Sequence, residues 1–351
     1  MKLSDFDYEL PKECIAQFPA KRRDESRLIV LDRGGGDIRE TRFSNFPRFL
    51  QEGDVLVVNE SRVIPARLFG RRKSGGLVEV FLVRCLADKR WVAMVRPASR
   101  LRTGESVLIG ERNLEISLGE RLGAGEWIVN LPGDVEEHAF IKAYGHVPLP
   151  PYIERDDGSE DAERYQTIFA RREGSVAAPT AGLHFTEEVL LDIKRRDVTL
   201  VPVTLHVGPG TFRALSDETV ENNRLEPESV LVMKDLWEEI EEAKRSKRRI
   251  VAVGTTVTRV LESLARGPLI NQEERVIEGQ TYVSGTTDLF IYPGFTFRIV
   301  DALLTNFHLP KSSLFLLVSA FAGLETMRTT YRWAISRKFR FYSYGDAMFI
   351  R

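Results

Sequence analysis

Short hydrophobic runs separated by turn residues dominate the segment 77–131. Charged or glycine-rich turns divide them, and no helical period links them. Regular short strands with such turns are typical of a small antiparallel barrel or sandwich. We therefore predict an inserted small antiparallel β-barrel domain over residues 67–150. The strand-like runs are 77–86, 91–97, 106–109, 114–118 and 127–131.

After the proline-rich stretch 148–151, strand-like and helix-like segments begin to alternate. This alternation is typical of α/β layering, in which a sheet lies between helices. Buried strands are expected at 199–207, 250–253 and 300–304, and a charged helix over 236–249.

Capping residues mark two further helices in this part of the chain. Thr186 precedes two glutamates and an apolar face, which is typical of a helix N-terminus. Ser312 is expected to cap an apolar helix that Gly323 closes. The strand-like segments 27–33 and 54–58 fit the same unit. We predict a three-layer α/β sandwich domain formed by residues 1–66 and 151–351, into which the barrel is inserted.

Composition adds limits on partners. The 351 residues include 50 Lys and Arg and 51 Asp and Glu, and 43% are hydrophobic. The length suggests two domains with a sizeable core. A net charge of −1 argues against bulk electrostatic binding of nucleic acid, so any RNA must be held by a local basic surface.

Cysteine usage and apolar runs suggest the compartment. Cys14 and Cys85 are far apart and lack the spacing of a zinc site or a disulfide framework. The charged first residues leave no room for a signal peptide, and the apolar run 314–324 is too short for a bilayer. We expect a cytoplasmic monomer with no metal, no cofactor and no membrane association.

Four loops combine Gly, Thr or His with the end of a predicted strand. In an open α/β sheet, ligands bind beyond the carboxyl ends of the strands, where such loops converge. Taken singly, each loop is explained equally well as a tight turn. The loops are 174–186, 205–212, 253–256 and 304–311.

Common nucleotide-binding and hydrolase motifs are absent. No G-x-G-x-x-G or Walker A sequence occurs, and Gly208-Pro209-Gly210 lacks the third glycine of the dinucleotide fingerprint. G-x-S-x-G is absent too, which leaves a hydrolase nucleophile elbow without support.

Several longer segments resemble one known family from the first residues to the last, in order. Beyond the four loops, they are 4–11, 26–28, 53–68, 301–312 and 344–348. On these segments the chain is similar to the S-adenosylmethionine:tRNA ribosyltransferase-isomerases. The family's fold, an α/β sandwich with a small β-barrel, agrees with the organisation inferred above.

The resemblance implies an unusual use of S-adenosylmethionine, which donates its ribosyl carbons. The acceptor is 7-aminomethyl-7-deazaguanine at the wobble position of tRNA, and the products are epoxyqueuosine in tRNA, adenine and methionine. A plausible path removes a proton from the ribose 5′-carbon next to the sulfonium, expels adenine, adds the aminomethyl nitrogen and closes an epoxide as methionine leaves.

Acid–base groups are required, and histidine suits them because its pKa of about 6.5 lies near working pH. From the matched segments we predict catalytic roles for His184, His206, Glu228 and His308. A buried, hydrogen-bonded imidazole would explain each histidine equally well.

Binding residues follow from the same segments. Helix capping, core aromatics and internal ion pairs are the alternative explanations. For S-adenosylmethionine we predict Thr180, Phe185, Thr186, Gly208, Gly210, Thr211, Phe212, Gly254, Thr255, Thr256, Arg259 and Asn306. For tRNA we predict Arg62, Arg67, Arg71, Arg72, Lys73 and Lys311.

The chain departs from the family at one motif. Many members carry His-x-x-His-x-Glu after the Gly-Thr-Phe loop, whereas this chain has Asn223, Glu226 and Glu228 at those positions. Two alternative functions follow: a catalytically drifted tRNA-binding paralogue, or an S-adenosylmethionine-dependent RNA methyltransferase on an unusual fold. Release of adenine would distinguish the ribosyltransferase-isomerase activity from both of these alternatives.

Overall fold

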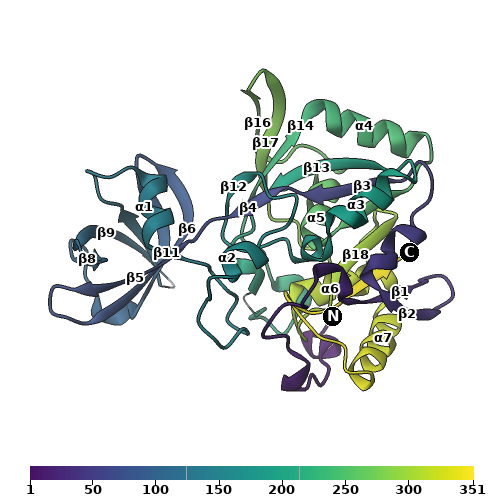
Figure 1. Ribbon diagram of the computed structural model, residues 1–351, viewed down its shortest axis with the longest axis horizontal. Helices are drawn as coiled ribbons and strands as arrows, with labels where there is room; N and C mark the ends of the chain where they lie inside the picture. The colour runs from purple at the N-terminus through teal and green to yellow at the C-terminus, as the bar shows by residue number, and fades with distance from the viewer. Residues whose placement is uncertain (124, 213) are drawn as a thin grey trace.

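The computed structural model describes residues 1–123, 125–212 and 214–351, leaving out the side chains of Thr211 and Phe212. Figure 1 shows a large body built around a long twisted sheet, and a smaller body joined to one side of it by extended segments.

The large sheet has ten strands and mixes parallel with antiparallel pairs. Its centre, β13-β3-β15-β18, is parallel throughout, so these four strands end at the same edge. In order across the sheet the strands are β16 (Ile270–Ile277), β17 (Gln280–Thr287), β14 (Glu228–Met233), β13 (Thr199–Leu205), β3 (Val55–Asn59), β15 (Ile250–Val253), β18 (Ala302–Asn306), β19 (Ala347–Ile350), β1 (Arg27–Leu31) and β2 (Ile38–Arg42).

Side chains of the central strands alternate between two cores, one on each face. In β3, Val55 and Val57 join one core, whereas Leu56 and Val58 join the other. Because both faces are covered, β3, β15 and β18 are buried along their whole length. The first core takes in the helices α4 (Lys234–Arg245), α5 (Thr255–Leu264), α6 (Ser313–Ala322) and α7 (Leu324–Ser336); the second takes in α3 (Glu187–Lys194).

The smaller body is a closed antiparallel barrel. Pairing of β5 with β8 closes a ring of six strands around a core of its own, and β11 (Gly145–His146) adds to β5 outside the ring. All its strands lie inside the segment 67–150 that we propose as the inserted domain. The ring contains β5 (Arg67–Arg72), β6 (Leu77–Ala87), β7 (Arg90–Arg96), β10 (Glu126–Asn130), β9 (Leu114–Gly123) and β8 (Ser106–Ile109), and α1 (Glu137–Tyr144) packs on it.

Two short strands lie where the chain passes between the bodies. On the way out it forms β4 (Ser61–Val63), and on return it forms α2 (Asp161–Arg164) and then β12 (Arg172–Ser175), which pairs parallel with β4. The predicted three-layer α/β sandwich with an inserted antiparallel barrel is thus confirmed.

Predicted helix caps are confirmed as well. The Thr186 side chain accepts the backbone N–H of Val189 at the start of α3, and Ser312 accepts that of Phe315 at the start of α6. Gly323 ends α6 at a φ of 87°, a conformation that favours glycine.

Candidate active site

The loops that follow three parallel strands meet beside a narrow cavity of about 60 Å³. Gly254 follows β15, Asn306 ends β18, and Val207 lies two residues beyond β13. This is the edge at which open α/β sheets bind ligands. Six of the predicted residues line the narrow cavity: Thr180, Gly254, Thr255, Thr256, Asn306 and His308.

Three buried polar atoms of the narrow cavity's lining lack a protein partner. They are Thr256 Oγ1, Asn306 Oδ1 and the Tyr342 hydroxyl, none of which has a hydrogen bond among the described residues. Burying such a group unpaired costs about 1–3 kcal/mol, so their grouping around one cavity points to a polar ligand that satisfies them.

The N-terminus of α5 adds backbone donors to the same cavity. Gly254 precedes the helix at a φ of 94°, and Thr255 begins it. The first N–H groups of a helix have no partner within the helix, and its dipole favours an anion there. The arrangement therefore suits a carboxylate or phosphate group.

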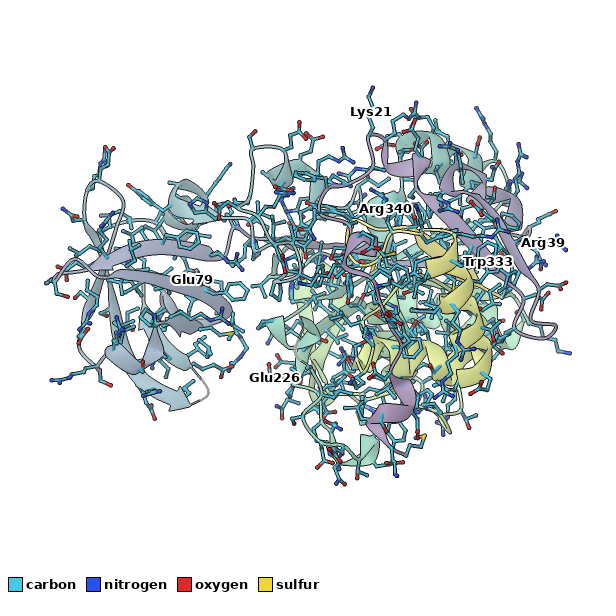
Figure 2. The ribbon with its side chains drawn as sticks, turned by 90° about the horizontal axis from the view of Figure 1, so that it is seen from below. Lys21, Arg39, Glu79, Glu226, Trp333 and Arg340 are labelled. Atoms are coloured by element: carbon cyan, nitrogen blue, oxygen red, sulfur yellow. The ribbon has the colours of Figure 1, made fainter. Side chains whose placement is uncertain are left out.

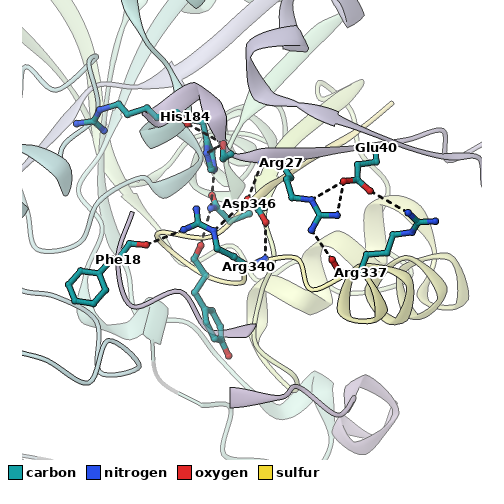
Figure 3. Close-up of polar contacts among 11 residues, drawn as sticks. Phe18, Arg27, Glu40, His184, Arg337, Arg340 and Asp346 are labelled. Atoms are coloured by element: carbon teal, nitrogen blue, oxygen red, sulfur yellow. Dashed lines mark hydrogen bonds and ion pairs between the residues drawn. The ribbon is translucent and has the colours of Figure 1, made fainter. Parts of the chain in front are cut away.

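His184 contacts Asn306, which lines the narrow cavity, and Figure 3 shows His184 with its polar contacts. Its Nδ1 is 2.7 Å from Ser26 Oγ, and its Nε2 is 3.2 Å from Asn306 Nδ2. Because Ser26 donates its own proton to the carbonyl of Arg23, it accepts from Nδ1–H, which leaves Nε2 to accept from the amide. Burial, and then the charges of Arg340 and Arg23, lower the pKa of His184 to about 3. The ring is therefore neutral at physiological pH.

This network fixes the orientation of Asn306. Its Nδ2 also donates to the carbonyl of Tyr342, 3.0 Å away, so both amide hydrogens are engaged. Oδ1 is then the acceptor left for a ligand. His184 acts on the narrow cavity through Asn306 and lies outside its lining.

His308 lines the narrow cavity and is nine-tenths buried. Its Nε2 lies 2.8 Å from Thr305 Oγ1, and its backbone N–H donates to the Tyr331 hydroxyl. Burial lowers the pKa of His308 to about 3, so this imidazole is also neutral.

A wide cleft of about 530 Å³ adjoins the narrow cavity and lies between the two bodies. Val207 and Leu314 line both spaces, so the two lie side by side. The barrel supplies part of the wall through Arg84, Cys85 and Trp91. Figure 2 shows Glu226 on the side of the large body that faces the barrel. Five predicted residues line this cleft: His206, Gly208, Gly210, Glu228 and Arg259.

His206 stands at the end of β13 with one ring nitrogen available. Its Nδ1 is buried and has no hydrogen bond among the described residues. Burial, and then the charge of Arg172, lower the pKa of His206 to about 4, so the ring is a neutral base. Gly174 packs against it: at a φ of 136°, a Cβ there would lie 2.9 Å from the imidazole Cε1.

Glu228 and Arg259 form a buried ion pair at the floor of the wide cleft. Their side chains are 7% and 6% exposed, and one guanidinium nitrogen of Arg259 donates to Glu228 Oε2. Glu228 Oε1 accepts the backbone N–H of Gly208 at 3.0 Å. The pair thus ties the glycine loop after β13 to α5, where Arg259 lies.

Asn223 and Glu226, which stand where many family members have histidines, differ in their surroundings. Asn223 lies outside the lining of both spaces, and its amide accepts the N–H groups of Ser216 and Asp217 and donates to three backbone carbonyls. Glu226 lies in the wide cleft, with Oε2 3.2 Å from where a Cβ on Gly210 would stand.

Comparisons with known proteins agree over the full length. A family model described as "Queuosine biosynthesis protein" matches residues 3–350. A protein of Halothermothrix orenii is 46% identical and one of Aquifex aeolicus 44% identical, each over the whole of both chains, and both are called S-adenosylmethionine:tRNA ribosyltransferase-isomerase. The chain belongs to the queuosine biosynthesis protein family.

A solved structure supports the family fold. The crystal structure of S-adenosylmethionine tRNA ribosyltransferase from Thermotoga maritima is 35% identical and covers 99% of this chain and 100% of that one, with a TM-score of 0.55. The resemblance inferred from the sequence segments is thereby confirmed. As for membranes, none of the helices in the described residues has the length and apolar character to cross one.

Some residues that the family resemblance suggested lie away from both spaces. Phe185 is fully buried in the core under α3, and the Thr186 side chain caps that helix. The side chains of Thr211 and Phe212 lie outside the described part of the structure. The ligand roles of these four residues stay predictions.

The basic residues predicted to contact tRNA are mostly paired with carboxylates. Arg67, Arg72 and Lys73 of the barrel lie 3.0, 3.1 and 2.9 Å from Glu79, Glu105 and Glu115. Arg62 is 3.7 Å from Glu173, Lys311 is 2.7 Å from Asp7, and Arg71 lies on the barrel strand β5. These contacts leave a tRNA role untested and show that the barrel cluster is largely neutralised.

Several lining residues escaped the sequence reasoning. Tyr152 and Tyr342 stack with centroids 4.3 Å apart and form a wall of the narrow cavity with Ser343. Tyr342 has a φ of 71°, a conformation that is rare for a tyrosine and that the sequence around it does not predict. The matched segment 344–348 directly follows these residues and is the signal that could have drawn attention to them.

Proposed function

We propose that this chain transfers and isomerises the ribosyl moiety of S-adenosylmethionine onto 7-aminomethyl-7-deazaguanine at the wobble position of tRNA. Epoxyqueuosine in tRNA, adenine and methionine are the products. The observation that carries the proposal is full-length similarity to proteins named for this activity. The site is consistent with it, because two adjoining spaces suit a ligand with a zwitterionic end and a bulky aromatic end.

The narrow cavity suits the methionine end of S-adenosylmethionine. The N-terminus of α5 and Thr256 Oγ1 offer donors to a carboxylate, and Asn306 Oδ1 offers an acceptor to the neighbouring ammonium. An α-amino acid carries both groups on one carbon, so a small cavity with both kinds of partner fits it.

The adenosine part then extends past Val207 and Leu314 into the wide cleft. Glu173 and Glu226 bring negative charge to the lining, which favours a sulfonium and a protonated aminomethyl group. Because the barrel forms the opposite wall, the modified base of the tRNA can enter between the two bodies.

His206 is the base that this placement favours. It adjoins Val207, where the two spaces join and where the sulfonium and the ribose 5′-carbon would lie. The neutral imidazole takes the 5′-proton as the C–H bond breaks. The electron pair forms a C4′–C5′ double bond as the C4′–O4′ bond breaks, and O4′ then forms a carbonyl with C1′ as the bond to adenine breaks. The imidazolium then returns the proton to the departing adenine. A neutral ring with a free nitrogen is ready for the first step at pH 7.

Product analysis tests the proposal. Purified protein is incubated with S-adenosylmethionine and tRNA bearing the aminomethyl base, and small molecules and digested tRNA are examined by mass spectrometry. Adenine together with epoxyqueuosine supports it. S-adenosylhomocysteine would instead indicate an RNA methyltransferase, and tRNA binding without adenine a catalytically drifted paralogue. His206→Gln should abolish adenine release, whereas His138→Gln, at an exposed histidine on α1, should not.

A further inference from the structure

Three arginines surround a small pocket on the far side of His184 from the narrow cavity. We call it the arginine pocket; Arg23, Arg164 and Arg340 line it together with Ser26, Ser343 and Gly345. Ser343 also lines the narrow cavity, so the two spaces are separated by little more than His184 and Ser343. None of the three arginines belongs to the site described above.

The guanidinium groups of two of these arginines are held by backbone carbonyls. Arg23 donates to the carbonyls of Leu183 and Glu163, at 3.2 and 2.9 Å. Arg164 donates to the carbonyls of Ala20 and Lys21, at 2.6 and 3.3 Å. Among the described residues, neither has a carboxylate within ion-pair distance, and the buried Nε of Arg164 has no hydrogen bond.

Two of the acidic groups nearby are engaged by cations outside the pocket. Asp24 pairs with Arg22 at 3.2 Å, and Asp161 pairs with Arg155 at 2.6 Å. Asp346 accepts the backbone N–H groups of Arg27 and Arg340, and its nearer oxygen is 3.8 Å from the Arg340 Nε (Figure 3). Asp346 thus offsets the charge of Arg340 in part, whereas Arg23 and Arg164 keep no carboxylate partner among the described residues.

Mutual repulsion supports the same conclusion. Burial, and then the charge of Arg164, lower the pKa of Arg23. The charges of Arg340 and Arg23 likewise lower the pKa of the neighbouring His184. Fixed guanidinium groups that repel one another gain most from an anion that several of them can bind at once.

We propose that the arginine pocket binds a phosphodiester group of the tRNA substrate. This choice of ligand rests on the proposed function. Phosphate suits it because each guanidinium offers a planar fork of donors.

Its surroundings favour a polynucleotide over a free ion. The ring of Phe18 is 64% exposed next to the pocket, with the Arg155 guanidinium 4.5 Å from its centroid, and Arg340 donates to its carbonyl. An open groove next to Arg340 is lined by Arg27, Arg42 and Lys338 and also by Glu25 and Glu40, of which Glu40 pairs with Arg27 at 2.6 Å. An exposed aromatic ring beside arginine side chains is a recurrent feature of surfaces that bind single-stranded nucleic acid.

Salt-dependent tRNA binding tests the proposal. The affinity of the full-length protein for the tRNA is measured by fluorescence anisotropy between about 50 and 200 mM salt. The double variant Arg23→Gln/Arg164→Gln should bind roughly tenfold more weakly at the lower salt. Its slope of log affinity against log salt should fall by about 0.7, the value for one single-stranded phosphate contact.

A charge-matched control is the double variant Arg245→Gln/Arg275→Gln, at two exposed arginines that pair with Glu242 and Glu273. It should change neither quantity. If the double variant behaves like this control, the proposal is wrong. Arg340→Gln offers a second test should the double variant fail to fold, and it should lower the same slope. Arg164→Lys should restore the slope in part, because it keeps the charge and loses the fork.

Inorganic phosphate distinguishes the source of the anion. If phosphate binds the wild-type pocket by NMR titration while the double variant retains full tRNA affinity, the pocket serves a free anion and the RNA assignment is overturned. Failure of the proposed function looks different: wild-type protein would then release no adenine, while the variants would still alter the salt slope of tRNA binding.

Discussion

Replacing Glu228 by glutamine tests how the wide cleft is held together. The change keeps the size of the side chain and removes its charge. Among the described residues, Arg259 would then stay buried with the carbonyls of Leu289 and Thr287 as its remaining partners, at 3.0 and 3.4 Å. Breaking a buried ion pair from one side costs about 3–5 kcal/mol, because the remaining charge is uncompensated. Glutamine still accepts the N–H of Gly208, so we expect the lower end, about 3 kcal/mol.

The loss is measured by urea unfolding, followed by circular dichroism in the helical band. Helices α2 to α7 belong to the large body, so this signal reports mainly on the part that contains the pair. Glu173→Gln is the matched control: its carboxylate lines the same cleft, is 43% exposed and lies 3.7 Å from Arg62. An exposed pair contributes about 0–1 kcal/mol.

Catalysis should respond as well. Without the charged acceptor, the loop from Gly208 to Gly210 is held less firmly at the cleft, so the KM for S-adenosylmethionine should rise. Adding Arg259→Met should recover most of the lost stability and none of the activity. The reasoning is refuted if Glu228→Gln destabilises the protein no more than Glu173→Gln does.

Three further changes probe other parts of the site. Gly174→Ala places a methyl group 2.9 Å from the His206 ring at a φ of 136°, so adenine release should fall at least about tenfold with unchanged far-ultraviolet circular dichroism; retained activity would contradict this. Asn306→Ala removes the free acceptor of the narrow cavity, and calorimetry should show S-adenosylmethionine binding weakened roughly tenfold while tRNA affinity is kept. Burial holds the pKa of His308 at about 3, against about 6.5 in the unfolded chain, so the unfolded chain binds the extra proton between these values and stability falls with falling pH. Urea titrations at several pH values from neutral downward should show a fall that is shallower in His308→Gln by about 1.4 kcal/mol per pH unit, and equal slopes would refute it.

Elements with strong local signals were predictable from the sequence. The helix α6 has a serine cap, a glycine end and an apolar interior, and it forms where these signals place it. The strands β15 and β18 are buried hydrophobic runs, and their order along the chain gives the parallel sheet. Because ligand loops follow such strands, part of the narrow cavity could be predicted before the fold was known.

Elements and contacts without a sequence pattern of their own were missed. The strand β16 is almost wholly exposed and polar, so no alternation marks it, and it forms by pairing with β17 across a turn at Glu278 and Gly279. Arg249 follows the charged helix α4 and looks like part of a solvated helix end. In the fold its Nη2 lies 2.6 Å from Oδ2 of Asp54, whose side chain is only 2% exposed.

In the candidate site, too, some residues could be predicted from the sequence and others could not. Gly254 and Thr256 could be predicted because they sit directly after a buried strand. Thr186 has the same residue type and lies in a matched loop, yet its hydroxyl is used within its own helix. Tyr152 and Tyr342 lie far apart in the sequence and meet only in the folded chain. Residue type alone does not separate these cases, because tertiary contacts decide them.

The central claim is that ribose carbons pass from S-adenosylmethionine to the tRNA. The most direct measurement uses S-adenosylmethionine labelled with ¹³C in the ribose and tRNA that carries the aminomethyl base, followed by mass spectrometry of the digested tRNA. We predict that the labelled ribose carbons appear in the modified nucleoside and that unlabelled adenine is released in equal amount. Labelled ribose that stays joined to adenine, as in unreacted substrate or S-adenosylhomocysteine, would contradict the account.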